Sequence, residues 1–203
     1  MKVGLYFGSF NPIHNGHTHL AEYLLHAGGL DEVWLVVSPN NPLKKRSDLW
    51  DEKLRLRLAE LATEDINGLK VSDIETTLPL PSYTVNTLMA LSERYPNNEF
   101  TLLMGSDNMS IFDRWRDWEY IVNNFPIMVY PRKGDDIEYL KRKYPKMKVI
   151  DGAPLLDISS TQIRNLLKEG KPISGLVNDK VEEKIASMRN EYSNVDKTEK
   201  IGM

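Results

Sequence analysis

The sequence predicts an α/β fold: a doubly wound, Rossmann-like, mostly parallel sheet with a C-terminal helical appendage. Two observations predict it. Short, nearly continuous apolar runs of four or five residues recur along the chain, as in strands that are buried on both faces of a parallel sheet. Stretches with the apolar spacing of amphipathic helices lie between these runs. Such alternation of strands and helices favours an open α/β sheet.

The strands expected from these runs are residues 3–7, 33–37, 100–104 and 127–130. The helices between them carry apolar residues on one face. These residues are Leu20, Ala21, Leu24 and Leu25, then Leu54, Leu58, Leu61 and Ala62, then Val85, Leu88 and Met89. The first of these helices is expected to stop at the glycine pair 28–29, because glycine commonly ends helices.

The last quarter of the chain changes character and predicts the appendage. Ser159 and Gln162 form a capping box, so a helix is expected to begin there and to stop near Gly170. A second helix is expected over about residues 178–188. We interpret residues 1–190 as one domain, with residues 155–190 as its helical appendage. Residues 193–203 are polar and aperiodic, and we predict that they are disordered.

Composition narrows the class of protein. The 203 residues suit one large domain, and 26 Lys+Arg against 29 Asp+Glu argue against a protein that mainly coats nucleic acid or membranes. Cysteine is absent, which excludes disulfides, cysteine-based zinc sites and thiol nucleophiles. No apolar run approaches the ~18 residues that a membrane span needs, and no signal peptide is recognisable. We therefore expect a soluble, cytoplasmic protein.

The segment that follows the first strand has the features of an anion site. It runs from Gly8 to His17 and leads into a helix, whose first N–H groups are unpaired and lie at the positive end of its dipole. His14 and His17 are three residues apart, so both imidazoles can face one site and stabilise a polyphosphate. With His19 and His26 they are the only histidines of the sequence. A zinc site is the alternative, but His19 should point elsewhere on the helix.

Two motifs carry a resemblance to a known family. Residues 8–17, Gly-Ser-Phe-Asn-Pro-Ile-His-Asn-Gly-His, closely resemble the first signature of the nucleotidylyltransferase superfamily, and residues 158–164, Ile-Ser-Ser-Thr-Gln-Ile-Arg, resemble its second signature. Within that superfamily the chain is most similar to the bacterial nicotinate-nucleotide adenylyltransferases. The similarity extends over residues 1 to about 190 and includes the segments Pro81–Thr84, Gly105–Asp107 and Trp115.

The resemblance implies roles for individual residues. It makes His14, His17 and Arg164 the catalytic residues, which contact the ATP phosphates. The ATP-binding residues that it implies are Gly8, Ser9, Phe10, His14, His17, Lys44, Gly105, Asp107, Ser159, Ser160, Thr161 and Arg164. From the residues alone, the second signature offers donors at a helix N-terminus and a planar guanidinium suited to phosphate oxygens. A plain helix cap is the simpler reading of the serines.

The resemblance also implies an acceptor pocket made by Thr84, Trp115 and Arg116. A tryptophan face can stack on a pyridine ring, and a hydroxyl can donate to its carboxylate. Some residues depart from the family pattern. Either Lys44 or Lys45 can take the place of the family's phosphate-contacting lysine, and the roles of Arg116, Arg132 and Trp118 are left open.

The activity implied is transfer of AMP from ATP to nicotinate mononucleotide, giving deamido-NAD and pyrophosphate without a covalent intermediate. Mg²⁺ carried on the ATP phosphates is the implied cofactor, with no metal ligands from the protein. The partners are then small molecules and neither nucleic acid nor membrane; the sequence leaves open whether the protein is a homo-oligomer. The alternatives are nicotinamide mononucleotide or phosphopantetheine as acceptor, a non-catalytic nucleotide-binding regulator, and an RNA-binding patch over residues 141–148.

Overall fold

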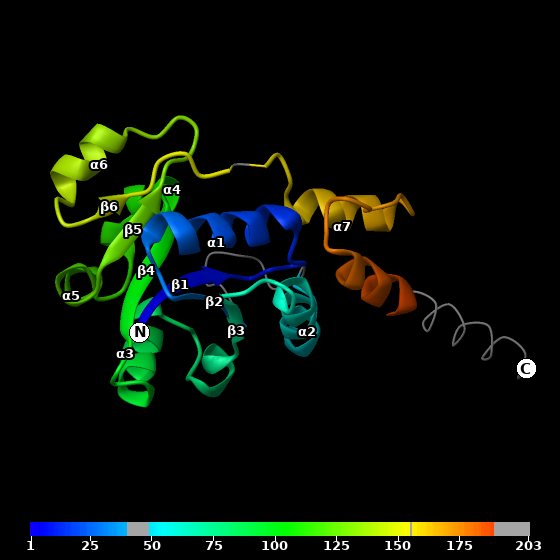
Figure 1. The fold of residues 1–203 in the computed structure, drawn as a ribbon, viewed down its shortest axis with the longest axis horizontal. Coiled ribbons are helices and arrows are strands. Elements are labelled where there is room, and N and C mark those ends of the chain that lie inside the picture. Colours follow the sequence, from blue (N-terminus) through cyan, green and yellow to red (C-terminus); the bar gives the residue numbers. More distant parts are fainter. Residues whose placement is uncertain (40–48, 155, 189–203) are drawn as a thin grey trace, which may run out of the picture.

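The computed structural model describes residues 1–39, 49–154 and 156–188. Strands and helices alternate along the chain (Figure 1), and the 3₁₀ helices among the described residues are named η2 and η3. The elements are β1 Lys2–Gly8, α1 Asn15–Gly28, β2 Glu32–Val37, α2 Glu52–Thr63, β3 Leu69–Ser72, η2 Ile74–Thr77, α3 Thr84–Arg94, β4 Glu99–Gly105, α4 Ser106–Ser110, η3 Phe112–Arg114, α5 Trp118–Asn124, β5 Ile127–Tyr130, α6 Ile137–Lys143, β6 Lys148–Val149 and α7 Ser160–Lys168. Residues 179–188 form a further helix.

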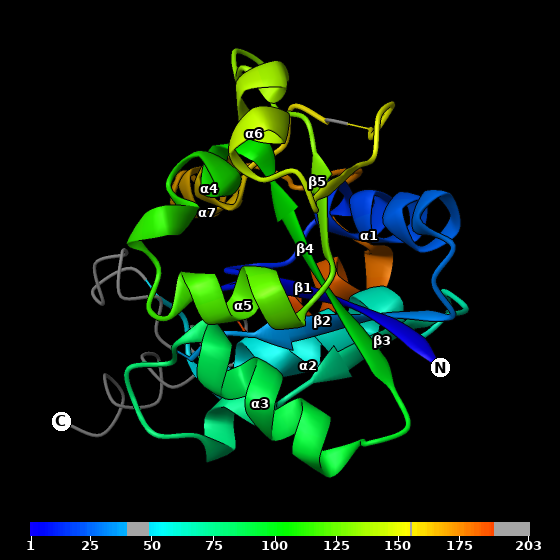
Figure 2. The same cartoon turned by 90° about the vertical axis from the view of Figure 1, so that its left-hand side faces the viewer.

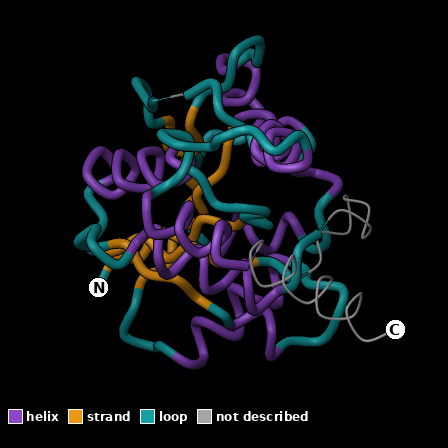
Figure 3. The backbone as a smooth tube through the Cα atoms, turned by 90° about the vertical axis from the view of Figure 1, so that its right-hand side faces the viewer, coloured by secondary structure: helices purple, strands orange, loops and turns teal. Residues whose placement is uncertain are grey.

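The sheet has six strands in the order β3-β2-β1-β4-β5-β6, and all five strand pairs are parallel. The predicted doubly wound α/β fold is thereby confirmed. The strand order reverses between β1 and β4, and the crevice at such a switch point is where open α/β sheets bind ligands. Figure 2 shows β1 and β4 side by side at the centre of the sheet, and Figure 3 shows the strands enclosed by helices.

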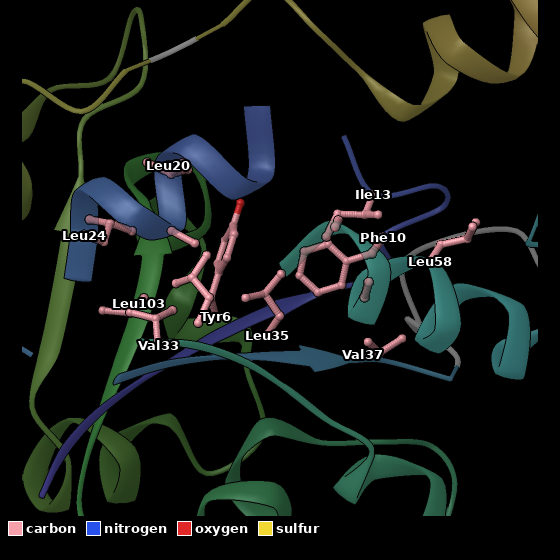
Figure 4. Packing of buried hydrophobic residues seen from close by; sticks show 14 of the residues in the cluster. Tyr6, Phe10, Ile13, Leu20, Leu24, Val33, Leu35, Val37, Leu58 and Leu103 are labelled. Carbon is pink, nitrogen blue, oxygen red and sulfur yellow. The ribbon is translucent and has the colours of Figure 1, made fainter. Parts of the chain in front are cut away.

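Each face of the sheet packs into its own hydrophobic core. One core contains Leu24 of α1, Leu58 of α2 and Ile163 of α7, all fully buried. Figure 4 shows Leu20 and Leu24 above the strands, with Phe10 and Ile13 past the end of β1, toward Leu58. The other core joins helices α3, α5 and α6 to the opposite face. Burial on both faces explains why the inner strands read as continuous apolar runs.

The structure differs from the expected elements in two respects, the edge strands and Met89. The edge strands β3 and β6 were not predicted, because they have only four and two residues and half of each is polar. Met89 was expected on the buried face of α3, but it is 52% exposed, since Leu88 and Leu91 fill that face. The predicted end of the first helix is confirmed, and Gly29 there adopts the left-handed conformation with φ of 67°.

The C-terminal helices pack against the sheet through one of its cores. Ile163, Val181 and Ile185 join the core on the α1 side. Where the chain passes the start of α1, the Asn15 amide donates to the Leu176 carbonyl at 2.9 Å, and Asn15 Nδ2 donates to another carbonyl of this segment at 3.0 Å. The appendage is therefore fixed against the helix start that follows the first signature. The predicted disordered tail, residues 193–203, lies outside the described residues.

Candidate active site

A cavity of about 1000 Å³ lies at the carboxyl ends of β1 and β4. The segments that follow these strands line it, together with the N-terminal turns of α3 and α7. Apart from Lys44, which lies outside the described residues with its neighbour Lys45, every predicted site residue lines this cavity. These residues are Gly8, Ser9, Phe10, His14, His17, Thr84, Gly105, Asp107, Trp115, Arg116, Ser159, Ser160, Thr161 and Arg164.

The two histidines of the first signature lie face to face at the start of α1. Their rings stack with centroids 3.6 Å apart and planes inclined by 25°. His14 is the N-cap, and its amide donates to His17 Nδ1 at 3.3 Å. That bond leaves Nε2 of His17 as the nitrogen that carries the proton when the ring is neutral. The Phe10 and His17 rings pack in a T-shaped arrangement with their centroids 5.1 Å apart, and this contact further restricts the imidazole.

His14 is uncharged at neutral pH. Its side chain is buried, and burial lowers its pKa from 6.5 to about 4 because the imidazolium would lose its hydration. Its neutral ring is a hydrogen-bonding group and carries no net charge. A bound polyphosphate would favour the imidazolium, so the proton affinity of His14 is expected to rise when such a ligand arrives.

The second signature docks directly onto the first. Ser159 caps α7 by accepting from the Gln162 amide at 3.1 Å, as the capping box predicted. Ser160 Oγ donates to the Pro12 carbonyl at 2.9 Å, so its hydroxyl proton ties the two signatures together, where the sequence analysis expected a phosphate donor. Arg164 Nη1 donates to the Asn11 carbonyl at 2.9 Å. The guanidinium is therefore held at the cavity wall by the first signature itself.

On the β4 side, Gly105 and Asp107 meet a group of polar side chains. Arg132 Nη2 donates to the Tyr130 hydroxyl at 3.2 Å, and its Nε lies 3.9 Å from Asp107 Oδ1. A Cβ on Gly105 would lie 3.2 Å from Arg132 Nε and would overlap the Asp107 carboxylate. This glycine, which the resemblance places among the ATP-binding residues, therefore makes room for protein side chains. The buried Tyr6 hydroxyl lies beside the group, and burial raises its pKa.

The predicted acceptor residues line the cavity beside the second core, against which Tyr83 and Trp115 pack. Thr84 is the first residue of α3, and Trp115 follows η3 with its ring 5.4 Å from the buried Phe112. The Arg116 guanidinium lies over the Tyr83 ring at 4.7 Å. Both Tyr83 and Arg116 line the cavity, although the sequence analysis left Tyr83 out of the site. The arrangement offers an aromatic face, a hydroxyl and a cation at the cavity wall.

The remaining aromatic candidate belongs to the core. Trp118 does not line the cavity, and its ring packs edge-on against Phe112 at 6.3 Å and Tyr144 at 6.1 Å. Trp115 is half-buried, as Trp118 is, but it lines the cavity. Trp115, which the resemblance places in the acceptor pocket, is thus available for stacking on a ligand.

Comparison with known proteins decides the family. The cytidylyltransferase-like family model matches residues 5–166. The probable nicotinate-nucleotide adenylyltransferase of Flavobacterium johnsoniae is 53% identical over 91% of this chain and 96% of its own length; that of Bacteroides fragilis is 49% identical over 85% of both chains. The chain belongs to the nicotinate-nucleotide adenylyltransferases. The Plasmodium falciparum nicotinic acid mononucleotide adenylyltransferase complexed with NaAD shares the fold, with a TM-score of 0.76, 21% identity and coverage of 92% and 95%.

Two buried charged residues of this adenylyltransferase were missed from the sequence. Arg55 of α2 is 1% exposed, and Glu75 of η2 is 2% exposed at the cavity wall. Arg55 lies three and four residues before the buried Leu58 and Ala59, so its helical spacing places it on the core face and was the available signal. Glu75 Oε1 accepts from Thr87 Oγ1 at 2.8 Å. Burial raises the pKa of Glu75, opposed by the hydroxyls of Thr87 and Ser38.

Two alternatives find no support in the described part of the adenylyltransferase. His19 and His26 are exposed and do not line the cavity, and no group of three or more His, Cys, Asp or Glu residues there could hold a metal ion. In the basic run 141–148, Lys141 Nζ donates to Glu138 at 2.8 Å and Lys143 Nζ to Asp113 at 2.9 Å, as on a solvated helix face. None of the helices in residues 1–39, 49–154 and 156–188 has the length and apolarity to span a bilayer.

Proposed function

We propose that the chain transfers AMP from ATP to nicotinate mononucleotide, and that the phosphate of the mononucleotide attacks the α-phosphorus directly, in line. The observation that carries this proposal is that residues of both signatures and of the predicted acceptor pocket, Thr84 and Trp115, line one cavity. Two substrates bound to these groups can meet in the same cavity. Positioning of this kind and stabilisation of developing charge are the main contributions of a protein to phosphoryl and nucleotidyl transfer.

His14, His17 and Arg164 are the proposed catalytic residues. As the bond between the α- and β-phosphates breaks, negative charge develops on the departing pyrophosphate. A proton on His17 Nε2 and the Arg164 guanidinium can donate to those oxygens, and both are held in place before the substrate binds. Thr161 Oγ1 accepts from Arg164 Nη2 at 3.2 Å and keeps the guanidinium plane fixed.

Thr84 and Trp115 are proposed to bind the pyridine ring and its carboxylate. The ring stacks on Trp115, and the Thr84 hydroxyl donates to the carboxylate at the N-terminus of α3, where the helix dipole also favours an anion. Arg116, held over Tyr83, adds a positive charge at the cavity wall. A carboxylate therefore meets donors and positive charge, whereas an amide would direct its own N–H groups at them.

The proposed cofactor is Mg²⁺ bound to the ATP phosphates. The donor set of the cavity fits this: it combines histidines and arginines with the single carboxylates of Asp107 and Glu75, and Mg²⁺ at phosphates keeps several waters and needs few protein ligands. The ion supplies neutralisation of phosphate charge. We also propose that the protein acts in the cytoplasm on small molecules only, without nucleic acid or membrane partners.

Product identification tests the proposal. The purified protein is incubated with ATP, Mg²⁺ and, separately, nicotinate mononucleotide, nicotinamide mononucleotide or phosphopantetheine, and the products are identified by mass. We expect deamido-NAD and pyrophosphate from nicotinate mononucleotide, and His17→Ala serves as the inactive control. No adenylylated product with any acceptor would indicate a non-catalytic nucleotide-binding regulator.

Isotope exchange tests the direct attack. Without an acceptor, labelled pyrophosphate should not exchange into ATP, because no adenylyl-enzyme forms. Exchange in the absence of any acceptor would show a covalent intermediate and would contradict the proposed in-line transfer.

A further inference from the structure

The buried arginine of α2 bonds only to main-chain carbonyls. Nη1 of Arg55 donates to the carbonyls of Ser9 and Ser38, at 2.7 Å each. Its Nη2 donates to the Pro39 carbonyl at 3.2 Å, and its Nε donates to the Trp50 carbonyl at 3.1 Å. The guanidinium thus joins the segments that follow β1 and β2 to the segment that precedes α2. All of these segments lie at the carboxyl edge of the sheet.

Burying the charged guanidinium of Arg55 costs free energy, because the group loses its hydration. Burial lowers its pKa, and the carboxylates of Glu52 and Asp51 oppose this shift only through space, without a direct ion pair among the described residues. Replacing buried ionic groups by apolar side chains of similar volume often leaves a protein as stable as before, or makes it more stable. Packing alone therefore does not account for an arginine at this position, and the carbonyls that it fixes are the feature to explain.

The bond to Ser9 sets the direction of the next amide. The Ser9–Phe10 peptide bond is trans, so its N–H points opposite to the carbonyl that Arg55 holds. Phe10 lines the cavity and Arg55 does not. Among the described residues, no acceptor takes the Phe10 N–H. It is therefore available to an anion in the cavity.

The conformation of Phe10 requires restraint from outside. Its φ of 43° is in the left-handed region, which a non-glycine residue adopts at a cost. The buried ring packs edge-on against Tyr6 at 5.7 Å and His17 at 5.1 Å, which fixes the side chain. Arg55 fixes the peptide on the other side of the same residue. Together these contacts hold an orientation that the free chain would disfavour.

The same arginine is linked to the second signature. Arg55 holds the Trp50 carbonyl, the Trp50 amide donates to Asn11 Oδ1 at 2.9 Å, and the Asn11 carbonyl accepts from Arg164 Nη1 at 2.9 Å. One continuous set of hydrogen bonds thus runs from the base of α2 to the guanidinium at the cavity wall.

We propose that Arg55 is a positioning residue for the ATP triphosphate: by holding the Ser9 carbonyl it directs the Phe10 amide at the phosphates, and through Trp50 and Asn11 it orients Arg164. The proposal rests on the proposed adenylyl transfer from ATP. It assigns a role in nucleotide binding to a side chain that does not reach the nucleotide. The acceptor pocket at Thr84 and Trp115 shares none of these hydrogen bonds.

Arg55→Lys tests the proposal, because lysine keeps the charge but cannot reproduce the planar set of bonds. We expect the KM for ATP to rise about tenfold and kcat to fall by a similar factor, because the Phe10 amide and Arg164 lose their fixed orientation but are still present. The KM for nicotinate mononucleotide should change less than about twofold. The matched control is Arg57→Lys on the same helix, where Arg57 is 54% exposed and pairs with Glu60 at 3.1 Å. It should behave as the wild type.

A spectroscopic measurement tests the amide itself. In ¹⁵N-labelled wild-type protein, α,β-methylene-ATP should shift the Phe10 amide resonance strongly, and in Arg55→Lys this shift should be much reduced. An unmoved Phe10 amide in the wild type would overturn the proposal whether or not the variant folds, and so would a folded variant with the wild-type KM for ATP. Failure of the wild type to adenylylate any acceptor would instead refute the proposed function.

Discussion

Replacing His14 with glutamine is expected to flatten the dependence of stability on pH. The folded protein holds His14 with a pKa of about 4, against 6.5 for an unperturbed histidine, because burial disfavours the imidazolium. As the pH falls below 6.5, His14 takes up a proton in the unfolded chain, whereas in the folded protein it stays neutral until the pH approaches 4. His14 therefore costs stability increasingly between pH 6.5 and about 4, and glutamine removes this cost.

The size of the effect follows from the two pKa values. Below both pKa values, their difference corresponds to a loss of about 3 kcal/mol of unfolding free energy. At pH 4.5, about 2.5 kcal/mol of this should already be lost. Glu75 contributes with the opposite sign: burial raises its pKa, so its contribution falls as the pH rises above its ordinary 4.5. Glu75 is present in both proteins, so it cancels in the difference between the wild type and the variant.

Urea denaturation at pH 7.5 and pH 4.5 measures this difference. Between these values the wild type should lose about 2.5 kcal/mol more unfolding free energy than His14→Gln. His19→Gln is the matched control, since His19 is on the same helix but exposed, and it should follow the wild type. Equal losses in the wild type and His14→Gln would refute the burial argument and with it the neutral state of His14.

Three further substitutions test the proposed site. His17→Ala should keep the fold and lower kcat on the order of 10²–10³, as for loss of one preorganised donor, and a folded variant with near-wild-type kcat would remove His17 from the mechanism. Arg164→Lys keeps the charge but loses the bonds to Asn11 and Thr161, so kcat/KM should fall; an unchanged value would make Arg164 structural. Thr84→Val should reduce kcat/KM for nicotinate mononucleotide more than for nicotinamide mononucleotide, and equal losses would place the carboxylate elsewhere.

The parts of the fold that the sequence could predict are those with a local signal. Strands β1, β2, β4 and β5 are buried on both faces, and their apolar runs are therefore continuous. The capping box of Ser159 and Gln162 specifies the start of α7 from four residues alone. Strands β3 and β6 lack such a signal, because they lie at the edges of the sheet and their pairing depends on strands distant in sequence.

The site residues, too, could be predicted only where the signal is local in the sequence. The signatures predicted which residues line the cavity, but the use of each group depends on contacts between distant segments. Ser160 donates to Pro12, 148 residues away, and Arg55 donates to Ser9, 46 residues away. Gly105 faces the side chains of Asp107 and Arg132, which no local pattern indicates. These contacts arise from the tertiary fold, so sequence spacing could not predict them.

The choice between the two pyridine mononucleotides tests the central claim most directly. The measurement is kcat/KM for nicotinate and for nicotinamide mononucleotide, with ATP and Mg²⁺ saturating. An amide in a pocket of donors leaves buried groups unpaired at about 1–3 kcal/mol each, so the acid should be preferred at least about tenfold. Equal values, or a preference for the amide, would contradict the assignment of the Thr84, Trp115 and Arg116 pocket to a carboxylate.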